Sequence, residues 1–218
     1  MVTERLCASC AALTGMSGAG IMLMADDLAQ GSLCSTGPTS ALIEQVQYTL
    51  GEGPCVDAHR QGRPVVEPDL AGTGAGRWAA FVEPVVAAGV GAVFGFPLRV
   101  GAVRLGALNL YRDSPGDLSD DQHADALVLA DVAAEVILLL QARAPAGMLA
   151  DELARSADLH VVVHQAAGMV AVQLGIGVTD ALVRLRAHAF AYDRPLREVA
   201  DDVVARRLRF DTLDDQDD

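Results

Sequence analysis

A break at Ala144-Pro145-Ala146-Gly147 constrains the fold of this 218-residue chain more than any other feature of its sequence. Upstream of the break, strand-like and helix-like apolar patterns are mixed, whereas downstream every apolar repeat has the spacing of a helix. We therefore expect a mixed domain followed by an all-α domain. At ~100–200 residues per domain, the length leaves room for no more than these two.

The pattern upstream of the break predicts an antiparallel sheet with helices packed around it. Strands are expected over residues 19–24, 33–36, 92–98 and 103–111, and helices over residues 39–50 and 54–61. A polar turn at Asp26-Asp27 joins the first two strands, and Gly101 lies in the turn of a hairpin formed by the other two. Ser119 and Gln122 have the spacing of a capping box, which opens a helix to about Ala142. This arrangement belongs to the α+β class.

The pattern downstream of the break predicts a three-helix unit. Gly175-Ile176-Gly177 closes the first helix, Thr179 caps the second, and Pro195 begins the third. The expected buried stripes are Leu159, Val162, Val163, Ala166, Val170 and Leu174; then Val178, Leu182, Leu185, Ala189 and Tyr192; then Leu196, Val199, Ala200, Val203 and Val204. A unit this small gains no more than ~3–5 kcal/mol from its own core, so we expect it to pack against the preceding helix or a second subunit.

The charges are unevenly placed along the four expected parts of the chain. These parts are an α+β domain over residues 1–143, a connecting helix or linker over 144–156, the three-helix domain over 157–210 and an acidic tail over 211–218. All 16 basic side chains are Arg, and 29 acidic side chains give a net charge of −13, which argues against non-specific coating of nucleic acid. Between Arg184 and Arg209, however, seven Arg outnumber four acids, a local net charge of +3. A binding site for phosphate or carboxylate is therefore expected in that window.

The cysteines and histidines do not form a recognisable catalytic or metal site. Cys7 and Cys10 have CxxC spacing without a second such pair, so we expect buried structural thiols in an N-terminal helix. His160 and His164 are four residues apart but lack a third ligand, and we expect them on the surface. No Gly-x-Ser-x-Gly motif or Ser/His/Asp set is present, and we expect no enzyme activity and no metal. The Gly-rich segment over residues 72–76 lacks the ending of a P-loop and is expected to be a surface loop or lid.

The N-terminal part resembles a GAF sensor domain of the actinobacterial type. The resemblance is carried by Leu50-Gly51-Glu52-Gly53-Pro54-Cys55, by Gly62-Arg63-Pro64, by Arg77-Trp78 and by the strand that ends Asn109-Leu110-Tyr111. It implies a sensor with a pocket between the sheet and the helices that cover it, near residues 53–58 and 67–81. A small-molecule ligand would bind there, and the sequence does not identify it.

The C-terminal part resembles an ANTAR domain, the three-helix RNA-binding unit of transcription antiterminators. The resemblance is carried by Gln165-Ala166-Ala167-Gly168-Met169, by Leu185-Arg186-Ala187-His188-Ala189 and by residues 196–204. Where the family commonly has Lys, this chain has Ala167, so one cation is missing from the expected RNA-binding face. The order GAF then ANTAR is itself typical of antitermination regulators.

The two resemblances together imply a cytoplasmic, dimeric regulator that binds paired hairpins in nascent leader RNA and acts on transcribing RNA polymerase indirectly. The absence of a leader or a long apolar run also favours the cytoplasm and excludes a membrane partner. The expected RNA-binding residues are Gln165, Ala166, Gly168, Arg184, Arg186, Ala189, Phe190, Arg194 and Arg197. Dimerisation is expected through the helices over residues 119–142 and 148–156.

Alternatives stay open for some of these residues and for the whole chain. Arg197 lies four residues before Asp201, a spacing that also suits a simple ion pair on a helix. Small residues such as Ala166 and Ala189 are equally at home in a helical core. For the whole chain, the alternatives are a sensor and dimerisation module that acts through protein contacts without RNA and, with less support, a thiol-based reductase of the GAF fold using Cys34 and Cys55.

Overall fold

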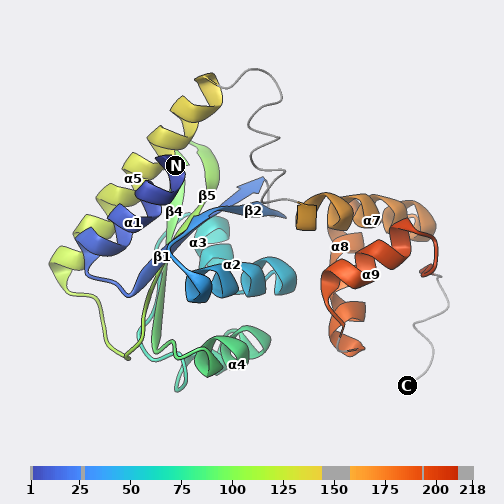
Figure 1. The fold of residues 1–218 in the computed structure, drawn as a ribbon, viewed down its shortest axis with the longest axis horizontal. Coiled ribbons are helices and arrows are strands. Elements are labelled where there is room, and N and C mark those ends of the chain that lie inside the picture. Colours follow the sequence, from blue (N-terminus) through green and yellow to red (C-terminus); the bar gives the residue numbers. More distant parts are fainter. Residues whose placement is uncertain (1, 26–27, 144–157, 193, 211–218) are drawn as a thin grey trace. The chain divides into compact units, whose positions relative to one another are not determined.

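The computed structural model describes residues 2–25, 28–143, 158–192 and 194–210. The chain divides into two compact units, Met1–Leu153 and Ala154–Asp218, which are treated separately below (Figure 1). The connecting helix expected over residues 144–156, the acidic tail and the turn at Asp26-Asp27 lie outside the described residues.

The N-terminal unit is built on a five-stranded antiparallel sheet, in the order β2-β1-β5-β4-β3. The strands are β1 (Gly18–Ala25), β2 (Leu28–Ser35), β3 (Val65–Glu67), β4 (Ala92–Val100) and β5 (Val103–Arg112). The expected hairpin of β4 and β5 is confirmed, and β1 pairs with both β2 and β5. The prediction of an α+β fold with an antiparallel sheet is confirmed, although the short edge strand β3 was not predicted.

Helices cover both faces of this sheet (Figure 1). On one face lie α1 (Val2–Thr14) and α5 (Asp120–Arg143), and on the other lie α2 (Pro38–Leu50) and α3 (Pro54–Gln61), with α4 (Ala79–Ala87) packed beside α2. The predicted capping box is present, because the backbone N–H of Gln122 donates to Ser119 Oγ at 3.2 Å and that of Ser119 to Gln122 Oε1 at 3.1 Å. Side chains alternate along β5, so that Leu108 and Leu110 pack in the core with α1 and α5.

The Gly-rich segment over residues 72–76 is a surface loop, one of its two expected forms, since all of it but Gly74 is exposed, and its two ends are anchored. Leu70 is fully buried, and the 3-10 turn η1 (Gly74–Gly76) leads into Trp78, whose indole Nε1 donates to Asp57 Oδ2 at 3.0 Å. The first turn of α4 is held from a distance, because Glu52 Oε1 accepts hydrogen bonds from the backbone N–H groups of Ala80 and Phe81, at 3.0 and 2.9 Å. These contacts attach the segment to α3 and to the connection between α2 and α3.

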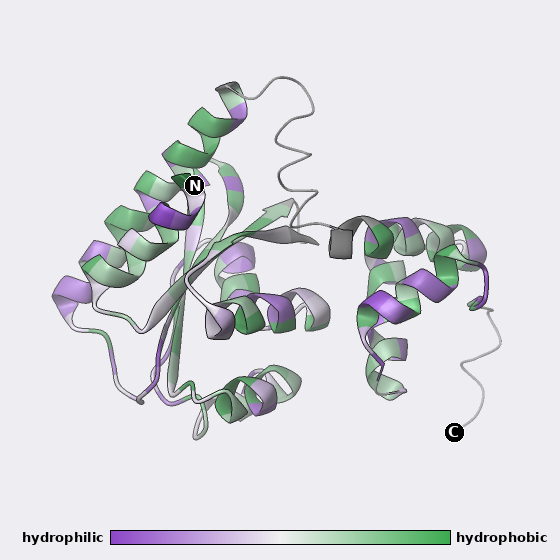
Figure 2. Cartoon of the chain, in the orientation of Figure 1, coloured by the Kyte–Doolittle hydropathy of each residue, from purple (hydrophilic) through white to green (hydrophobic). Residues whose placement is uncertain are grey.

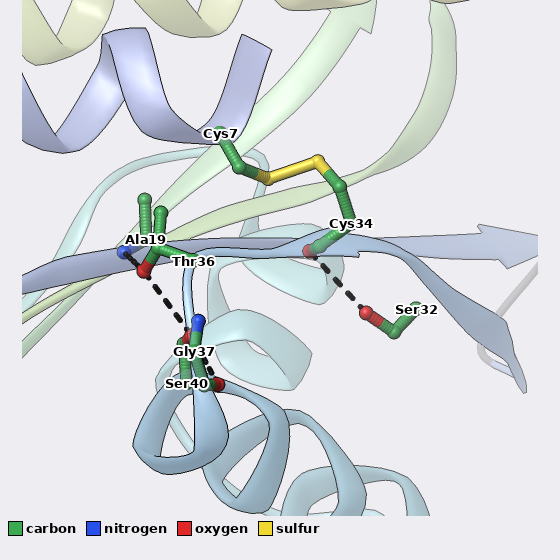
Figure 3. Close-up of a disulfide and its surroundings, with 7 residues drawn as sticks. All are labelled: Cys7, Ala19, Ser32, Cys34, Thr36, Gly37 and Ser40. Carbon is green, nitrogen blue, oxygen red and sulfur yellow. Dashed lines mark hydrogen bonds between the residues drawn. A yellow bond between two sulfur atoms is a disulfide. The ribbon is translucent and has the colours of Figure 1, made fainter. Parts of the chain in front are cut away.

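The prediction that Cys7 is a free structural thiol is wrong, because it is bonded to Cys34. Their sulfur atoms form a disulfide that joins α1 to β2 across a sequence separation of 27 residues (Figure 3). Cys10 and Cys55 are free and buried, as expected of structural thiols. The CxxC spacing was misleading because Cys7 bonds to Cys34, which the fold of the sheet brings near, and not to Cys10 in the same helix.

The C-terminal unit consists of α7 (Asp158–Leu174), α8 (Val178–Ala191) and α9 (Leu196–Val204) in the described part of the chain. Its core is formed by Val163, Ala166, Ala167, Val170, Ala171, Ala181, Leu182, Leu185, Ala189, Leu196, Val199, Ala200 and Val203. Gly175 ends α7 in the left-handed conformation, with φ 67°, as predicted. Thr179 is not the cap of α8, because the helix begins at Val178 and its N-cap is Gly177, two residues earlier.

Two residues of the predicted stripe on α8 are not in the core. Val178 is 46% exposed and Tyr192 is 66% exposed, because they lie at the two ends of the helix, beyond the reach of α7 and α9. Tyr192 instead lies beside the His188 ring, with a centroid distance of 4.5 Å. The central residues of the stripe, Leu182, Leu185 and Ala189, are buried as predicted.

The end of α9 contains a residue in an unfavourable backbone conformation. Arg206 has φ 60°, in the left-handed region that Gly usually occupies. Its N–H donates to Val203 O at 3.0 Å, and the N–H of Arg207 donates to Asp202 O at 2.8 Å, the two bonds of a Schellman motif. The chain therefore reverses sharply at Arg206 at some cost in free energy.

Removing the disulfide should destabilise the N-terminal unit. By loop-closure entropy, replacing Cys7 and Cys34 with Ser is expected to lower the free energy of unfolding by about 3 to 4 kcal/mol. The measurement is urea unfolding followed by fluorescence of Trp78, the one Trp in the chain. Addition of a reductant should destabilise the native protein by a similar amount and leave the double variant unchanged; an equal response of both would contradict the prediction.

Relieving the backbone conformation at residue 206 should stabilise the C-terminal unit. Arg206→Gly is expected to raise its free energy of unfolding by about 0.5 to 1 kcal/mol relative to Arg206→Ala, which removes the same charge but keeps a Cβ. Urea unfolding followed by helical circular dichroism measures the difference. If the two variants were equally stable, the left-handed conformation would not be a cost to the fold.

Candidate nucleic-acid interface

A groove runs between α7 and the chain that follows α9. Its volume is about 540 Å³, and it is lined by Gln165, Gly168, Met169, Val172, Gln173, Arg206 and Arg209. Two of the predicted RNA-binding residues, Gln165 and Gly168, therefore lie in the groove together with two Arg residues that the sequence analysis did not select.

The shape of the groove depends on Gly168 and on Gln173. A Cβ atom on residue 168 would meet nothing within 4 Å, so the surface of α7 is open at that point. One turn further along, Gln173 Oε1 accepts a hydrogen bond from the backbone N–H of Phe210 at 2.9 Å. This bond holds the segment after α9 beside α7, and the reversal at Arg206 directs the chain into that position.

The Arg residues of the basic window differ in what neutralises them. Arg194 and Arg207 both bind the carboxylate of Asp202, at 2.6 and 2.7 Å, and the hydrogen bond from Arg194 is the main cause of the lowered pKa of Asp202. Arg197 pairs with Asp201 at 3.7 Å, the ion pair that the sequence offered as its alternative role.

The groove carries the remaining uncompensated charge of that segment. Among the described residues, neither Arg206 nor Arg209 has an ion-pair partner, and both side chains are exposed. Because Asp201 and Asp202 are already bound to other Arg residues, an anion that approached the groove would meet two guanidinium groups that no carboxylate of the described residues binds. The groove is therefore suited to phosphate groups.

The predicted site residues of α8 lie apart from the residues that line the groove. Arg184 is exposed and Phe190 is 70% exposed, so both are accessible to a ligand. Arg186 is half-buried and its charge contributes, after burial, to lowering the pKa of His164 on α7. Ala166 and Ala189 are buried among the three helices, and their side chains pack in the core.

Sequence reasoning missed Arg206 and Arg209 because they follow the last helix of the motif. The one signal was their place inside the basic window, which does not separate a charged residue held by a neighbouring carboxylate from one that is not. To tell the two kinds of Arg apart, one must know where Asp201 and Asp202 of α9 lie in the folded unit.

The cysteines of the N-terminal unit do not have the properties of a catalytic thiol. Cys34 is in the disulfide, and Cys55 is fully buried, with a pKa raised well above its usual value, mainly by burial and further by the nearby Glu44. A reactive cysteine is accessible and has a low pKa. No group of three or more His, Cys, Asp or Glu side chains in the described part of the chain is placed to hold a metal ion.

No single helix among the described residues is long and apolar enough to cross a membrane. The pair α7 and α8 passes on length and composition only when the two are taken together, across a bend of 105°.

Comparisons with known proteins identify both units. The family model of the GAF domain matches residues 2–137, and that of the ANTAR domain matches residues 151–204. No curated protein matches the chain. GAF and ANTAR domains are regulatory domains of signal transduction and transcription.

Solved structures share the fold of the N-terminal unit. One is a domain from Sinorhizobium meliloti whose parent protein is named as a two-component sensor histidine kinase, with TM-score 0.53 and 19% identity over 65% of this chain and 91% of that one. The GAF domain of the cyanobacteriochrome TePixJ has TM-score 0.51 and 19% identity over 64% of this chain and 89% of its own. The GAF domain of an Acinetobacter phosphoenolpyruvate-protein phosphotransferase has TM-score 0.50 and 17% identity, over 66% and 84%. The chain belongs to the GAF domain family and carries an ANTAR domain after its GAF domain.

Proposed function

We propose that this protein is a cytoplasmic transcription antitermination regulator that binds paired hairpins in nascent leader RNA through its ANTAR unit. The GAF unit is the sensor, and RNA polymerase is affected indirectly, through the terminator that the bound RNA no longer forms. The observation that carries the proposal is the groove on α7, where Gln165 and Gly168 lie beside the uncompensated Arg206 and Arg209. RNA is bound through its phosphates and through bases splayed out of hairpin loops, and such a groove has donors for both.

The exposed residues of α8 provide a second part of the RNA contact. Arg184 is exposed on this helix, and the exposed Phe190 ring can stack on an unpaired base. We place Arg194 and Arg197 outside the contact, because each is bound to an Asp of α9, and we assign Ala166 and Ala189 to the core.

The dimer that the proposal needs is supported by the surface of α5. Hydrophobic residues recur along this helix (Figure 2), and Leu127, Val128, Val132 and Leu139 are exposed large side chains, with Val128 61% exposed. They lie on the side of α5 that faces away from the core of the unit. A second GAF unit would cover them, and two linked ANTAR units would bind two hairpins with the gain of avidity.

The experiment that tests the function is ultraviolet crosslinking of the protein in its host cell, followed by sequencing of the attached RNA. Leader segments with two adjacent hairpins ahead of a terminator should be enriched over an Arg206→Gln/Arg209→Gln double variant. Recovery of no RNA above that variant would favour the alternative of a sensor that acts through protein contacts.

Neutralising the groove should weaken RNA binding without unfolding the unit. Arg206→Gln and Arg209→Gln are each expected to cost about 1 to 3 kcal/mol of binding free energy and to reduce the salt dependence of binding. Gel-shift titration of the recovered leader RNA at several salt concentrations measures both effects. Arg197→Gln is the matched control, because it removes the same charge from an exposed residue that is held by Asp201. An equal loss in all three variants would mean that total charge, and not the groove, determines affinity.

Charged residues on the apolar side of α5 should separate the subunits. Val128→Asp with Val132→Asp is expected to give a monomer in analytical ultracentrifugation and to lower the affinity for two-hairpin RNA by roughly 10²-fold or more. Val103→Asp, at an exposed Val in the β4–β5 hairpin, is the control for a surface change of the same kind. A monomer that bound two-hairpin RNA as tightly as the native protein would disprove the role of the dimer.

A further inference from the structure

A buried row of residues crosses the face of the sheet that α2 and α3 cover. At its centre is Asn109 of β5, which is 0% exposed. Its cross-strand neighbours are Gly20 on β1 and Gly95 on β4. A polar side chain between two glycines is unusual for the centre of a sheet, where large apolar residues normally pack.

The two glycines allow polar groups from the helices to approach the sheet. A Cβ atom on residue 20 would lie 2.7 Å from Oε1 of Glu44, the α2 side chain that packs on this strand. A Cβ atom on residue 95 would collide with the carbonyl oxygen of Pro54 in the first turn of α3. The carboxyl group of Glu44 therefore lies directly against the backbone of β1, in a place that a side chain on residue 20 would fill.

The polar atoms gathered here have few partners. Glu44 is 2% exposed, and Gln47, one turn further along α2, is 0% exposed. Gln47 Oε1 accepts the backbone N–H of Cys55 at 2.7 Å, and the amide groups of Gln47 and Asn109 interact with the Cys55 thiol and with Glu44. The acceptors are less well matched, because both carboxyl oxygens of Glu44 and Asn109 Oδ1 have no hydrogen bond of normal geometry among the described residues. Buried polar groups are nearly always hydrogen-bonded, so three such acceptors in one place point to a missing binding partner.

The electrostatics of the cluster favour a cation. Burial raises the pKa of Glu44 to about 8, and the Asn109 amide lowers it by a smaller amount. The ionisable neighbour on α3 is the thiol of Cys55, which is uncharged, and no Arg or His contributes to the Glu44 pKa. An anion would be repelled once Glu44 ionised, whereas a cation would replace the proton that the buried carboxyl now holds.

We propose that Glu44, Gln47 and Asn109 form a binding site for a small cation with N–H donors, an ammonium ion or a short primary amine. Three unpaired acceptors, the two carboxyl oxygens and Asn109 Oδ1, match the N–H groups of such a ligand, and the near-complete burial limits its size. On binding, the O–H bond of Glu44 breaks, its proton goes to the solvent, and the carboxylate pairs with the cation. An alkali metal ion suits the site less well, since three oxygens are fewer ligands than a hard cation usually takes, whereas they can each accept one N–H group. The proposal concerns the input of the GAF unit and does not depend on RNA binding.

The test is thermal unfolding of the full-length protein at pH 7, followed by Trp78 fluorescence, in ammonium, methylammonium or potassium chloride at equal ionic strength. Potassium is the matched control, because it has the charge and nearly the size of ammonium without N–H donors. Ammonium or methylammonium should raise the unfolding midpoint by several degrees in a saturable way, and potassium should not. If only one of the two nitrogen cations acts, it identifies the size of the ligand. Equal midpoints in all three salts would overturn the proposal.

The variant Glu44→Gln should lose the ammonium-specific shift, whereas Glu83→Gln, at an exposed Glu of α4, should keep it. Calorimetry of the native protein in two buffers of different ionisation enthalpy gives an independent measure, which holds even if the Glu44 variant does not fold. Nearly one proton should be released per cation bound. Binding without proton release, or a shift that persists in Glu44→Gln, would place the cation elsewhere and overturn the assignment.

The ligand-free protein should also lose stability as the pH rises. In the unfolded chain Glu44 ionises near its ordinary pKa of 4.5, but in the folded protein it keeps its proton until about pH 8. The unfolding midpoint should therefore fall between about pH 5 and pH 8 and level off above, and ammonium should reduce this fall because it stabilises the ionised form. Glu44→Gln should remove this part of the pH dependence. The same fall in the native protein and in that variant would show that Glu44 is not its source.

Discussion

The burial of both faces of the central sheet is the constraint on which the N-terminal unit depends. A five-stranded sheet covered on one side only would leave a row of side chains in water, and here α1 and α5 cover one face while α2 and α3 cover the other. The two faces differ in the side chains that they carry. Aliphatic and aromatic residues such as Ile21, Phe94 and Leu108 fill the α1–α5 side, whereas the opposite side contains Asn109 and glycines that admit polar groups.

In the ANTAR unit, the positive charge that a ligand can meet depends on which Arg residues already bind a carboxylate. Asp202 binds two guanidinium groups and Asp201 a third, so a window with a large formal charge has only part of that charge available to a ligand. In a chain with net charge −13, the available part matters more than the total, because the long-range field does not favour nucleic acid. Under the proposed function, affinity for RNA would then have to come from a shaped contact such as the groove along α7.

The fold was predictable where periodicity is strong and local. The hairpin of β4 and β5, the capping box at Ser119 and the core of the three helices follow from patterns within a few residues. In contrast, α4 was missed because Pro84 interrupts it and its first turn is capped by Glu52, 28 residues before Ala80, and not by a residue of its own. The disulfide and the groove were missed for a similar reason, since both depend on residues that only the tertiary fold brings together.

For small residues, the residue type alone does not predict whether the side chain lies in the core or on the surface. Ala166 and Ala189 suit close approach to RNA and close approach between helices equally well, and only burial decides between them. The same holds for Glu44, whose place in the apolar pattern of α2 gave no sign of its burial.

The cap that Glu52 provides has a consequence for the motion of the GAF unit. Its carboxylate lies in the connection between α2, which carries Glu44, and α3, yet it satisfies two amide groups of α4. Movement of this connection away from the sheet would break both bonds, so any opening over Glu44 by that route also releases the first turn of α4. The amide hydrogens of Ala80 and Phe81 would then exchange with solvent at least as fast as the buried row of Glu44 and Asn109 becomes accessible by that movement.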